Sequence, residues 1–169
     1  PVDAHYRTEV GHIYAAGDVV GPPALATVSM SQARVAMCHA FDAVTKAELA
    51  PLLPTGIYTI PEVSMVGETE EALRQQGVEI VIGRARYADN ARGRIIGDET
   101  GFLKLLFRRD DMRLLGVHVI GEQATEVVHL GLLALLTSSS PDLFNQACFN
   151  YPTLGELYKQ ATYDALLQD

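Results

Sequence analysis

The segment from Gln123 to Leu136 constrains the fold more than any other part of the sequence, because it is apolar on nearly every face of the helix that its pattern predicts. A helix without a polar side must be covered on both sides. A bilayer does not supply that cover, since the longest apolar run, Val127 to Leu136, is about half of the roughly 20 residues that a crossing needs, and His129 interrupts it. One sheet covers only one side of the helix. We therefore expect this segment to lie between a sheet and a second copy of the chain.

The charge balance and the cysteines exclude several classes of protein. With 13 Lys and Arg against 21 Asp and Glu, the net charge is −8 at pH 7 over 169 residues, which gives no basic surface for nucleic acid or for an anionic membrane. Cys38 and Cys148 form no C-x-x-C pair, which argues against a disulfide framework and a zinc site. The start of the chain carries no basic segment followed by an apolar one, as a signal peptide would. The expected class is a soluble protein of the reducing cytoplasm.

The first 45 residues predict a short strand followed by a long helix. Ile13 to Ala16 is a brief apolar run that Gly17-Asp18 ends, and Gly21-Pro22-Pro23 then breaks the chain. From about Ala24 to Val44 there is no further Gly or Pro. Small residues recur there at helical spacing, and on a helix they form one stripe that allows close packing. They are Ala26, Ser29, Ala33, Ala36 and Ala40.

A linker from Lys46 to Pro54 predicts a domain boundary, since it combines mixed charge with two prolines. Beyond it, Thr69 is a good N-cap for a short helix that Gly77 ends, and a last helix runs from about Glu156 to Leu167. The apolar, β-branched and aromatic runs between these helices predict strands. The strands are expected at 57–60, 63–66, 78–87, 94–96, 101–108 and 114–120. Residues 52–169 thus predict an α+β domain, an antiparallel sheet with helices on one side.

A carboxylate and a helix start lie close together in the first 45 residues. Asp18 follows the predicted strand and precedes by a few residues the helix that begins near Ala24. Gly-Asp turns are common, and an Asp in one usually caps the turn. However, the free N–H groups and the positive dipole end of a helix suit an electron-rich, partly anionic ligand. A carboxylate that accepts from a sugar-type hydroxyl beside such a helix start suits a flavin.

Several ordered motifs resemble the flavoprotein pyridine nucleotide-disulfide oxidoreductases. The run His12-Ile13-Tyr14-Ala15-Ala16-Gly17-Asp18-Val19, followed by Leu25-Ala26, is similar to their second FAD-binding motif. The run from Pro54 to Val63, with Val66-Gly67, resembles the opening of their C-terminal dimerisation domain. The sheet and the long helix of that domain are matched in the right order by Gly101 to Leu105, Leu115 to Gly121 and Ala124 to Glu126. The resemblance runs from about Val2 to Tyr163.

The resemblance implies that residues 1–45 are the C-terminal remnant of an FAD-binding, Rossmann-like domain. Residues 52–169 would be the dimerisation domain, through which the protein forms a homodimer. Asp18 would contact the ribityl chain of the flavin, and the backbone at Ala26 and Thr27 would face the flavin ring. Gly17 and Leu25 belong to the same motif. The pyrophosphate-binding glycine loop, the redox disulfide and the nicotinamide site would lie before Pro1, which explains why no G-x-G-x-x-G occurs.

The segment from Tyr151 to Glu156, called the tail below, differs between members of the family. Those that reduce disulfides carry a His-Pro-Thr-x-x-Glu motif, whose His–Glu pair is given across the dimer and moves a proton to and from the thiols. This chain has Tyr151-Pro152-Thr153-Leu154-Gly155-Glu156 at that place. A tyrosine is neutral at pH 7 and is a poor base for a thiol. Tyr151 and Glu156 would line the other face of the flavin from the partner subunit, although a tyrosine before a turn proline also fits a plain packing residue.

Hydride transfer between a nicotinamide and a flavin needs stacking and orientation but no such base. Together with Phe149-Asn150, the tail resembles that of the soluble pyridine nucleotide transhydrogenases, which move hydride between NAD(H) and NADP(H) through FAD. A fragment of such an enzyme is the expected function. Two alternatives stay open. One is a dihydrolipoamide dehydrogenase-like disulfide reductase with an altered tail, and the other is a dimerisation module without catalysis.

No residue pattern predicts a metal site. His118 stands between two valines in a predicted strand, and His129 lies inside the apolar helix, so both are expected to be hydrogen-bonded structural histidines. His5 and His39 have no ligand-like spacing with a cysteine or a carboxylate. The glycines at 93, 97 and 101 are expected to form turns between short strands.

Overall fold

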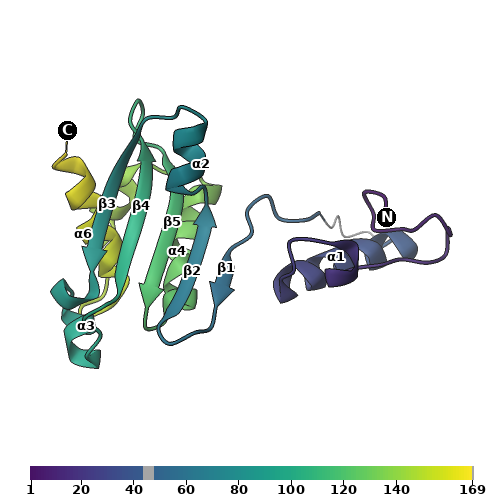
Figure 1. Ribbon diagram of the computed structural model, residues 1–169, viewed down its shortest axis with the longest axis horizontal. Helices are drawn as coiled ribbons and strands as arrows, with labels where there is room; N and C mark the ends of the chain where they lie inside the picture. Colours follow the sequence, from purple (N-terminus) through teal and green to yellow (C-terminus); the bar gives the residue numbers. More distant parts are fainter. Residues whose placement is uncertain (44–47, 169) are drawn as a thin grey trace. The chain divides into compact units, whose positions relative to one another are not determined.

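The computed structural model describes residues 1–43 and 48–168, and the chain divides into two compact units between Leu53 and Pro54 (Figure 1). The first unit holds a short 3-10 turn, η1 (Asp18–Val20), and one helix, α1 (Ala26–Ala40). The helix is shorter than the segment 24–44, and Val44 lies outside the described residues. The prediction of a strand at 13–16 was wrong. Only an isolated bridge between Arg7 and Tyr14 forms there, because no strand among the described residues of the first unit extends the pairing.

The buried face of α1 differs from the predicted stripe of small residues. Its buried side chains are Val28, Gln32, Val35 and Ala36. The remaining stripe residues are half-buried or exposed in this chain. The first unit therefore packs on a face that contains a polar side chain, and the small residues at the two ends of α1 are left uncovered by the described residues.

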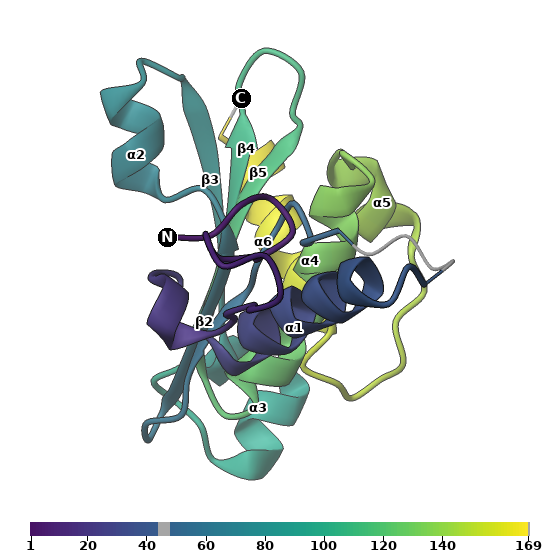
Figure 2. The ribbon, with the colours of Figure 1, turned by 90° about the vertical axis from the view of Figure 1, so that its right-hand side faces the viewer.

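The second unit is built on one sheet of five antiparallel strands in the order β1-β2-β5-β4-β3. The strands are β1 (Thr55–Ile57), β2 (Glu62–Gly67), β3 (Ile80–Arg86), β4 (Phe102–Arg108) and β5 (Leu114–Gly121). The helices are α2 (Glu70–Gln75), α3 (Ala91–Ile96), α4 (Ala124–Leu136), α5 (Pro141–Gln146) and α6 (Glu156–Leu166), and a 3-10 turn, η2 (Tyr87–Asp89), precedes α3. Helices α4, α5 and α6 lie on one side of the sheet and α2 on the other (Figure 2). The expected α+β architecture with an antiparallel sheet is confirmed, except that the short helix α2 does not share the side of α4, α5 and α6.

The core lies between the sheet and helices α4 and α6. Alternate residues of the strands point into it and are buried, which is the period-two pattern of a half-covered sheet. Among them are Val66, Val81, Leu103, Leu105, Phe107, Val117 and Val119. Gly83 lets α6 approach β3, because a Cβ at this position would overlap the carbonyl oxygen of Ala161. The hydroxyl of the buried Tyr158 links the two helices, since it donates to the Val127 carbonyl (2.9 Å) and accepts from the Gly131 N–H (3.0 Å).

Polar side chains form hydrogen bonds with backbone groups at two places in the second unit, the start of α4 and the edge strand β3. The carboxylate of Glu62 on β2 accepts from the backbone N–H and the hydroxyl of Thr125, at 3.1 and 2.8 Å, and so caps the first turn of α4. At the outer edge of β3, Asp164 accepts from the Arg84 N–H at 2.9 Å and Gln168 donates to the Ile82 carbonyl at 2.8 Å. The backbone groups of an edge strand are thus partly satisfied by side chains.

One predicted strand, 94–96, is a helix in the structure. Helix α3 begins after Asn90, whose side-chain oxygen accepts from the backbone N–H groups of Arg92 and Gly93 at 3.0 and 3.1 Å. It ends at Gly97, which has a left-handed backbone with φ 75°. This cap and this C-terminal glycine outweigh the β-branched pair Ile95-Ile96. The predicted N-cap of α2 is confirmed, because Thr69 accepts from the Ala72 N–H at 3.1 Å.

Candidate functional site

Gly17 and Asp18 are held beside the first turns of α1. The backbone N–H of Gly17 donates to the side chain of Gln32 at 2.7 Å, and a Cβ on Gly17 would lie 3.1 Å from the Ser29 hydroxyl. Gly17 has a φ of 85°, which favours glycine. The side chain of Asp18 is exposed. Gly17 and Asp18, before the break at 21–23, therefore lie at the same end of α1 as the predicted residues after the break, which are Leu25, Ala26 and Thr27.

The N-terminus of α1 has no side-chain cap. Leu25 is the N-cap residue, and its side chain carries no hydrogen-bonding group, while Ala26 and Thr27 are exposed. The first backbone N–H groups of this 15-residue helix are therefore available to a ligand. An exposed carboxylate beside free N–H groups fits the hydroxyl and carbonyl groups of a flavin.

Gln32 is a residue of this region that sequence reasoning missed. Its side chain is 4% exposed and fixes Gly17. The only signal in the sequence is a polar residue inside a run of small and apolar ones, which a helical pattern alone does not connect to a loop 15 residues earlier.

Tyr151 and Glu156 lie in the second unit, on the segment that leads into α6. Tyr151 is 75% exposed and precedes Pro152 through a cis peptide bond. Glu156 is half-buried and opens α6, where the helix dipole favours a negative charge. No hydrogen bond or ion pair joins the two side chains among the residues that the structure describes. The segment thus presents the tyrosine to solvent and keeps the carboxylate at the helix start.

A hollow of about 490 Å³ adjoins this segment. It is lined by Arg92 of α3, by Gln123, Glu126 and Val127 at the start of α4, and by residues 152–155. The tail therefore forms one wall of a depression whose other walls come from two helices.

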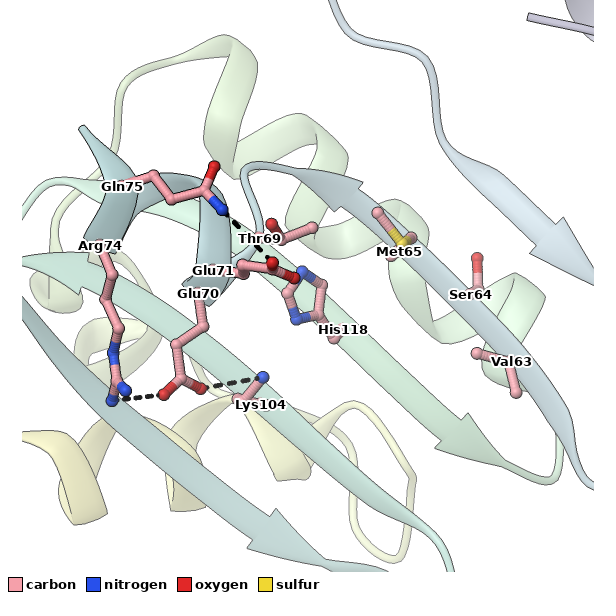
Figure 3. Close-up of a pocket in the computed structure, with 10 residues that line it drawn as sticks. All are labelled: Val63, Ser64, Met65, Thr69, Glu70, Glu71, Arg74, Gln75, Lys104 and His118. Carbon is pink, nitrogen blue, oxygen red and sulfur yellow. Dashed lines mark hydrogen bonds and ion pairs between the residues drawn. The ribbon is translucent and has the colours of Figure 1, made fainter.

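A second pocket, of about 600 Å³, lies on the side of the sheet that carries α2 (Figure 3). Its cations are already paired, because Glu70 binds Arg74 at 2.6 Å and Lys104 at 3.3 Å. Burial lowers the pKa of His118, and the charge of Lys104 lowers it further. The neutral ring donates from Nε2 to the Glu68 carbonyl at 3.1 Å, as expected of a structural histidine. None of the residues named for flavin or proton chemistry lines this pocket.

The described residues contain no group of three or more His, Cys, Asp or Glu side chains placed to hold a metal ion. His129, the other histidine expected to be structural, is exposed on α4. Within residues 1–43 and 48–168, no helix is long and apolar enough to cross a bilayer.

Comparison with known proteins shows to which family this architecture belongs. The family described as pyridine nucleotide-disulphide oxidoreductase, dimerisation domain, matches residues 53–162. The chain belongs to this family. Its dimerisation domain thus comprises the five-stranded sheet, the apolar helix α4 and the start of α6, including both Tyr151 and Glu156.

Relatives extend the similarity beyond the dimerisation domain. The chain is 48% identical over 165 residues to a soluble pyridine nucleotide transhydrogenase of Mycobacterium tuberculosis (strain ATCC 25177 / H37Ra). It is 44% identical over 171 residues to one of Marinobacter nauticus. Both alignments cover 98% of this chain but only 35% and 36% of the relatives. The chain therefore spans about a third of the length of the proteins that it matches.

Solved structures share the fold. LpdA from Mycobacterium tuberculosis matches with a TM-score of 0.82 at 27% identity, over 96% of this chain and 35% of that protein. The HOCl-induced flavoprotein disulfide reductase RclA from Escherichia coli matches with a TM-score of 0.88 at 22% identity, over 96% of this chain and 38% of that protein. The second similarity concerns the fold alone.

Proposed function

We propose that this chain is the C-terminal part of a flavoprotein that transfers hydride between NAD(H) and NADP(H). The observation that carries the proposal is the similarity to soluble transhydrogenases at 48% identity over 98% of the chain. The tail supports it, because Tyr151 stands where disulfide-reducing members of the family carry the histidine of their proton-transferring pair. In this proposal residues 1–45 close an FAD-binding domain, and residues 52–169 serve dimerisation.

The first unit would contribute part of the flavin site. Asp18 would accept from a hydroxyl of the ribityl chain, and the free N–H groups of Ala26 and Thr27 would face the ring, with Gly17 and Leu25 shaping the loop on either side. Bound FAD would supply the acceptor and donor of hydride between the two nicotinamides. The chain itself would orient the cofactor, and Tyr151 and Glu156, which would line its other face, are the candidate catalytic residues.

The exposed side of α4 supports a homodimer. Leu130, Leu133 and Leu136 are 40%, 62% and 48% exposed, although the opposite side of the same helix is buried against the sheet. A row of exposed leucines on one helix is typical of a protein interface. A partner that covers this row would also bring its own tail, with Tyr151 and Glu156, to the shared surface. The two free cysteines, Cys38 and Cys148, fit a cytoplasmic protein.

The activity is tested with the complete flavoprotein that contains this sequence. We expect NADPH to reduce a thionicotinamide analogue of NAD⁺ and expect no turnover with a lipoamide disulfide. Turnover with the disulfide, and none between the two nucleotides, would instead favour a dihydrolipoamide dehydrogenase-like reductase. Tyr151→Phe keeps the ring and removes the hydroxyl, so it separates an apolar role of Tyr151 from a role in proton transfer.

The dimer is tested by sedimentation of the 169-residue chain at micromolar concentration. We expect a dimer for the parent chain and a monomer for Leu133→Glu, because the new carboxylate would have to be buried without a partner. The control is Leu167→Glu, which adds the same charge at an exposed site beyond α6, next to β3. The leucine row is elsewhere, because helix α4, which carries it, packs on β5, β2 and β1. A monomeric parent chain, or a Leu133→Glu variant that stays dimeric, would contradict the proposal.

Flavin binding by the chain tests the alternative of a module without catalysis. We expect no tight binding of FAD, since the sequence has no glycine loop for the pyrophosphate. Quenching of flavin fluorescence on titration with the chain measures this. Stoichiometric binding would show that the first unit holds the cofactor without the rest of the domain.

A further inference from the structure

The side chain of Asn90 connects two segments that are distant in the sequence. It is 0% exposed. Its oxygen caps α3, with the Arg92 and Gly93 N–H groups at 3.0 and 3.1 Å, and its Nδ2 donates to the carbonyl of Thr153 at 3.2 Å. The amide thus uses its acceptor on its own helix and its donor on the tail, 63 residues further along the chain.

Thr153 stands in the middle of the tail, between Tyr151 and Glu156. Its hydroxyl donates to the Asn150 carbonyl at 2.7 Å, which closes a tight turn around Pro152. The next residue, Leu154, is 6% exposed and anchors the segment in the core. Tyr151 itself is 75% exposed, so its position is set mainly by the backbone to which it is attached.

We propose that Asn90 is a positioning residue, which fixes the turn at 150–153 through the Thr153 carbonyl and thereby sets where Tyr151 and Glu156 are presented. An amide is the side chain that meets both demands at this depth, because it offers an acceptor to α3 and a donor to the tail. The roles of Tyr151 and Glu156 rest on the proposed function. The fixing of the turn does not.

The variant Asn90→Asp separates the two duties of the amide. An aspartate is as good an N-cap as an asparagine, and the dipole of α3 favours its charge, so α3 is expected to stay capped. The ionised carboxylate has no donor, and it sets a second oxygen against the Thr153 carbonyl. Once protonated, the same carboxyl regains one O–H donor and can restore the link.

Hydrogen exchange of the backbone amides in the 169-residue chain tests the inference. At neutral pH we expect residues 149–155 of the Asn90→Asp variant to exchange about tenfold faster than in the parent chain, while strands β3 to β5 keep their protection. The ratio of variant to parent should fall back toward one as the pH is lowered. Because the charged side chains of Arg92 and Glu126 line the adjoining hollow, each ratio is taken against the parent chain at the same pH.

The control variant is Thr69→Ala, which removes the corresponding cap of α2 and should leave exchange at 149–155 unchanged. Unchanged exchange in Asn90→Asp, or faster exchange over the whole second unit that acid does not reverse, would overturn the inference. In the complete flavoprotein, we expect the variant to lower kcat for hydride transfer more than it changes KM. A loosened tail with an unchanged kcat would keep the positioning role and refute the part that the proposed function gives to the tail.

Discussion

The two units of the chain bury their apolar side chains to very different extents. In the first unit, Val28, Val35 and Ala36 are buried, whereas Val19, Phe41 and four other large apolar side chains are about half exposed or more. In the second unit a sheet face and two helices enclose a continuous core. The second unit therefore has what an independent domain needs. The first shows no such core among the residues that the structure describes, and it leaves six large apolar side chains exposed.

The largest expected effect comes from separating the two units. A chain of residues 54–169 should unfold in one cooperative transition, because it carries its own core. A chain of residues 1–53 should show no cooperative transition, since a single helix of 15 residues is marginal in water without packing. Thermal unfolding followed by circular dichroism measures both. A cooperative transition of 1–53 would show that the first unit is a domain in its own right.

A smaller effect is expected where the packing of the second unit is closest. Gly83→Ala places a methyl group on the carbonyl of Ala161 and should lower the free energy of unfolding by about 3 kcal/mol or more. The matched control in the first unit is Gly11→Ala, because a Cβ at that position meets nothing within 4 Å, and its effect should stay within about 0.5 kcal/mol. Denaturant unfolding measures both variants. Equal losses of unfolding free energy in the two variants would mean that the two units are packed equally closely, contrary to what their buried side chains indicate.

The smallest expected effect concerns a charge in the second unit. Burial opposes the ionisation of Asp98, but backbone N–H groups of Glu122, Gly101 and Thr100 donate to the carboxylate and lower its pKa below the ordinary value of 3.8. A carboxyl with a lowered pKa in the folded state stabilises fully above the unfolded pKa, and that contribution is lost as the pH falls through the folded pKa. The parent chain should therefore lose stability below pH 3.8.

The variant Asp98→Asn removes this titration. Its stability relative to the parent should be lowest above pH 3.8 and should recover on the acid side. Denaturant unfolding at pH values on both sides of 3.8 checks this, with Asp89→Asn, at an exposed position of η2, as the control. A constant difference between Asp98→Asn and the parent would show that Asp98 does not contribute through its charge.

The sequence predicts most of what is local and little of what joins distant segments. Thr69 and the apolar pattern of α4 are readable because each signal and its effect lie within one element. The signals of α3 were present too, in Asn90 and Gly97, but Ile95-Ile96 indicated a strand. By contrast, the contacts of Glu62 with α4 and of Gln32 with Gly17 appear only when the fold brings separated residues together.

The same limit applies to the candidate site. The motifs of the resemblance indicate Asp18 and Tyr151. They do not indicate that Asn90 binds the tail, because this hydrogen bond spans 63 residues and its acceptor is a backbone carbonyl, which no residue type reveals. The break at 21–23 predicted a helix start nearby, but the absence of a side-chain cap on α1 appears only in the structure. Its small-residue stripe was expected to be covered, and in this chain most of it is not.

The side chains that bind the outer edge of β3 make the two edges of the sheet differ in how easily another strand can pair with them. With Asp164 on the Arg84 N–H and Gln168 on the Ile82 carbonyl, a foreign strand would have to displace both before it paired there. Such protection is how natural sheets resist edge-to-edge aggregation. Strand β1, at the other edge, is short, ends at the exposed Ile57 and is followed by the exposed Tyr58. Any growth of the sheet by strand addition would therefore start at β1, an edge strand that packs against α4.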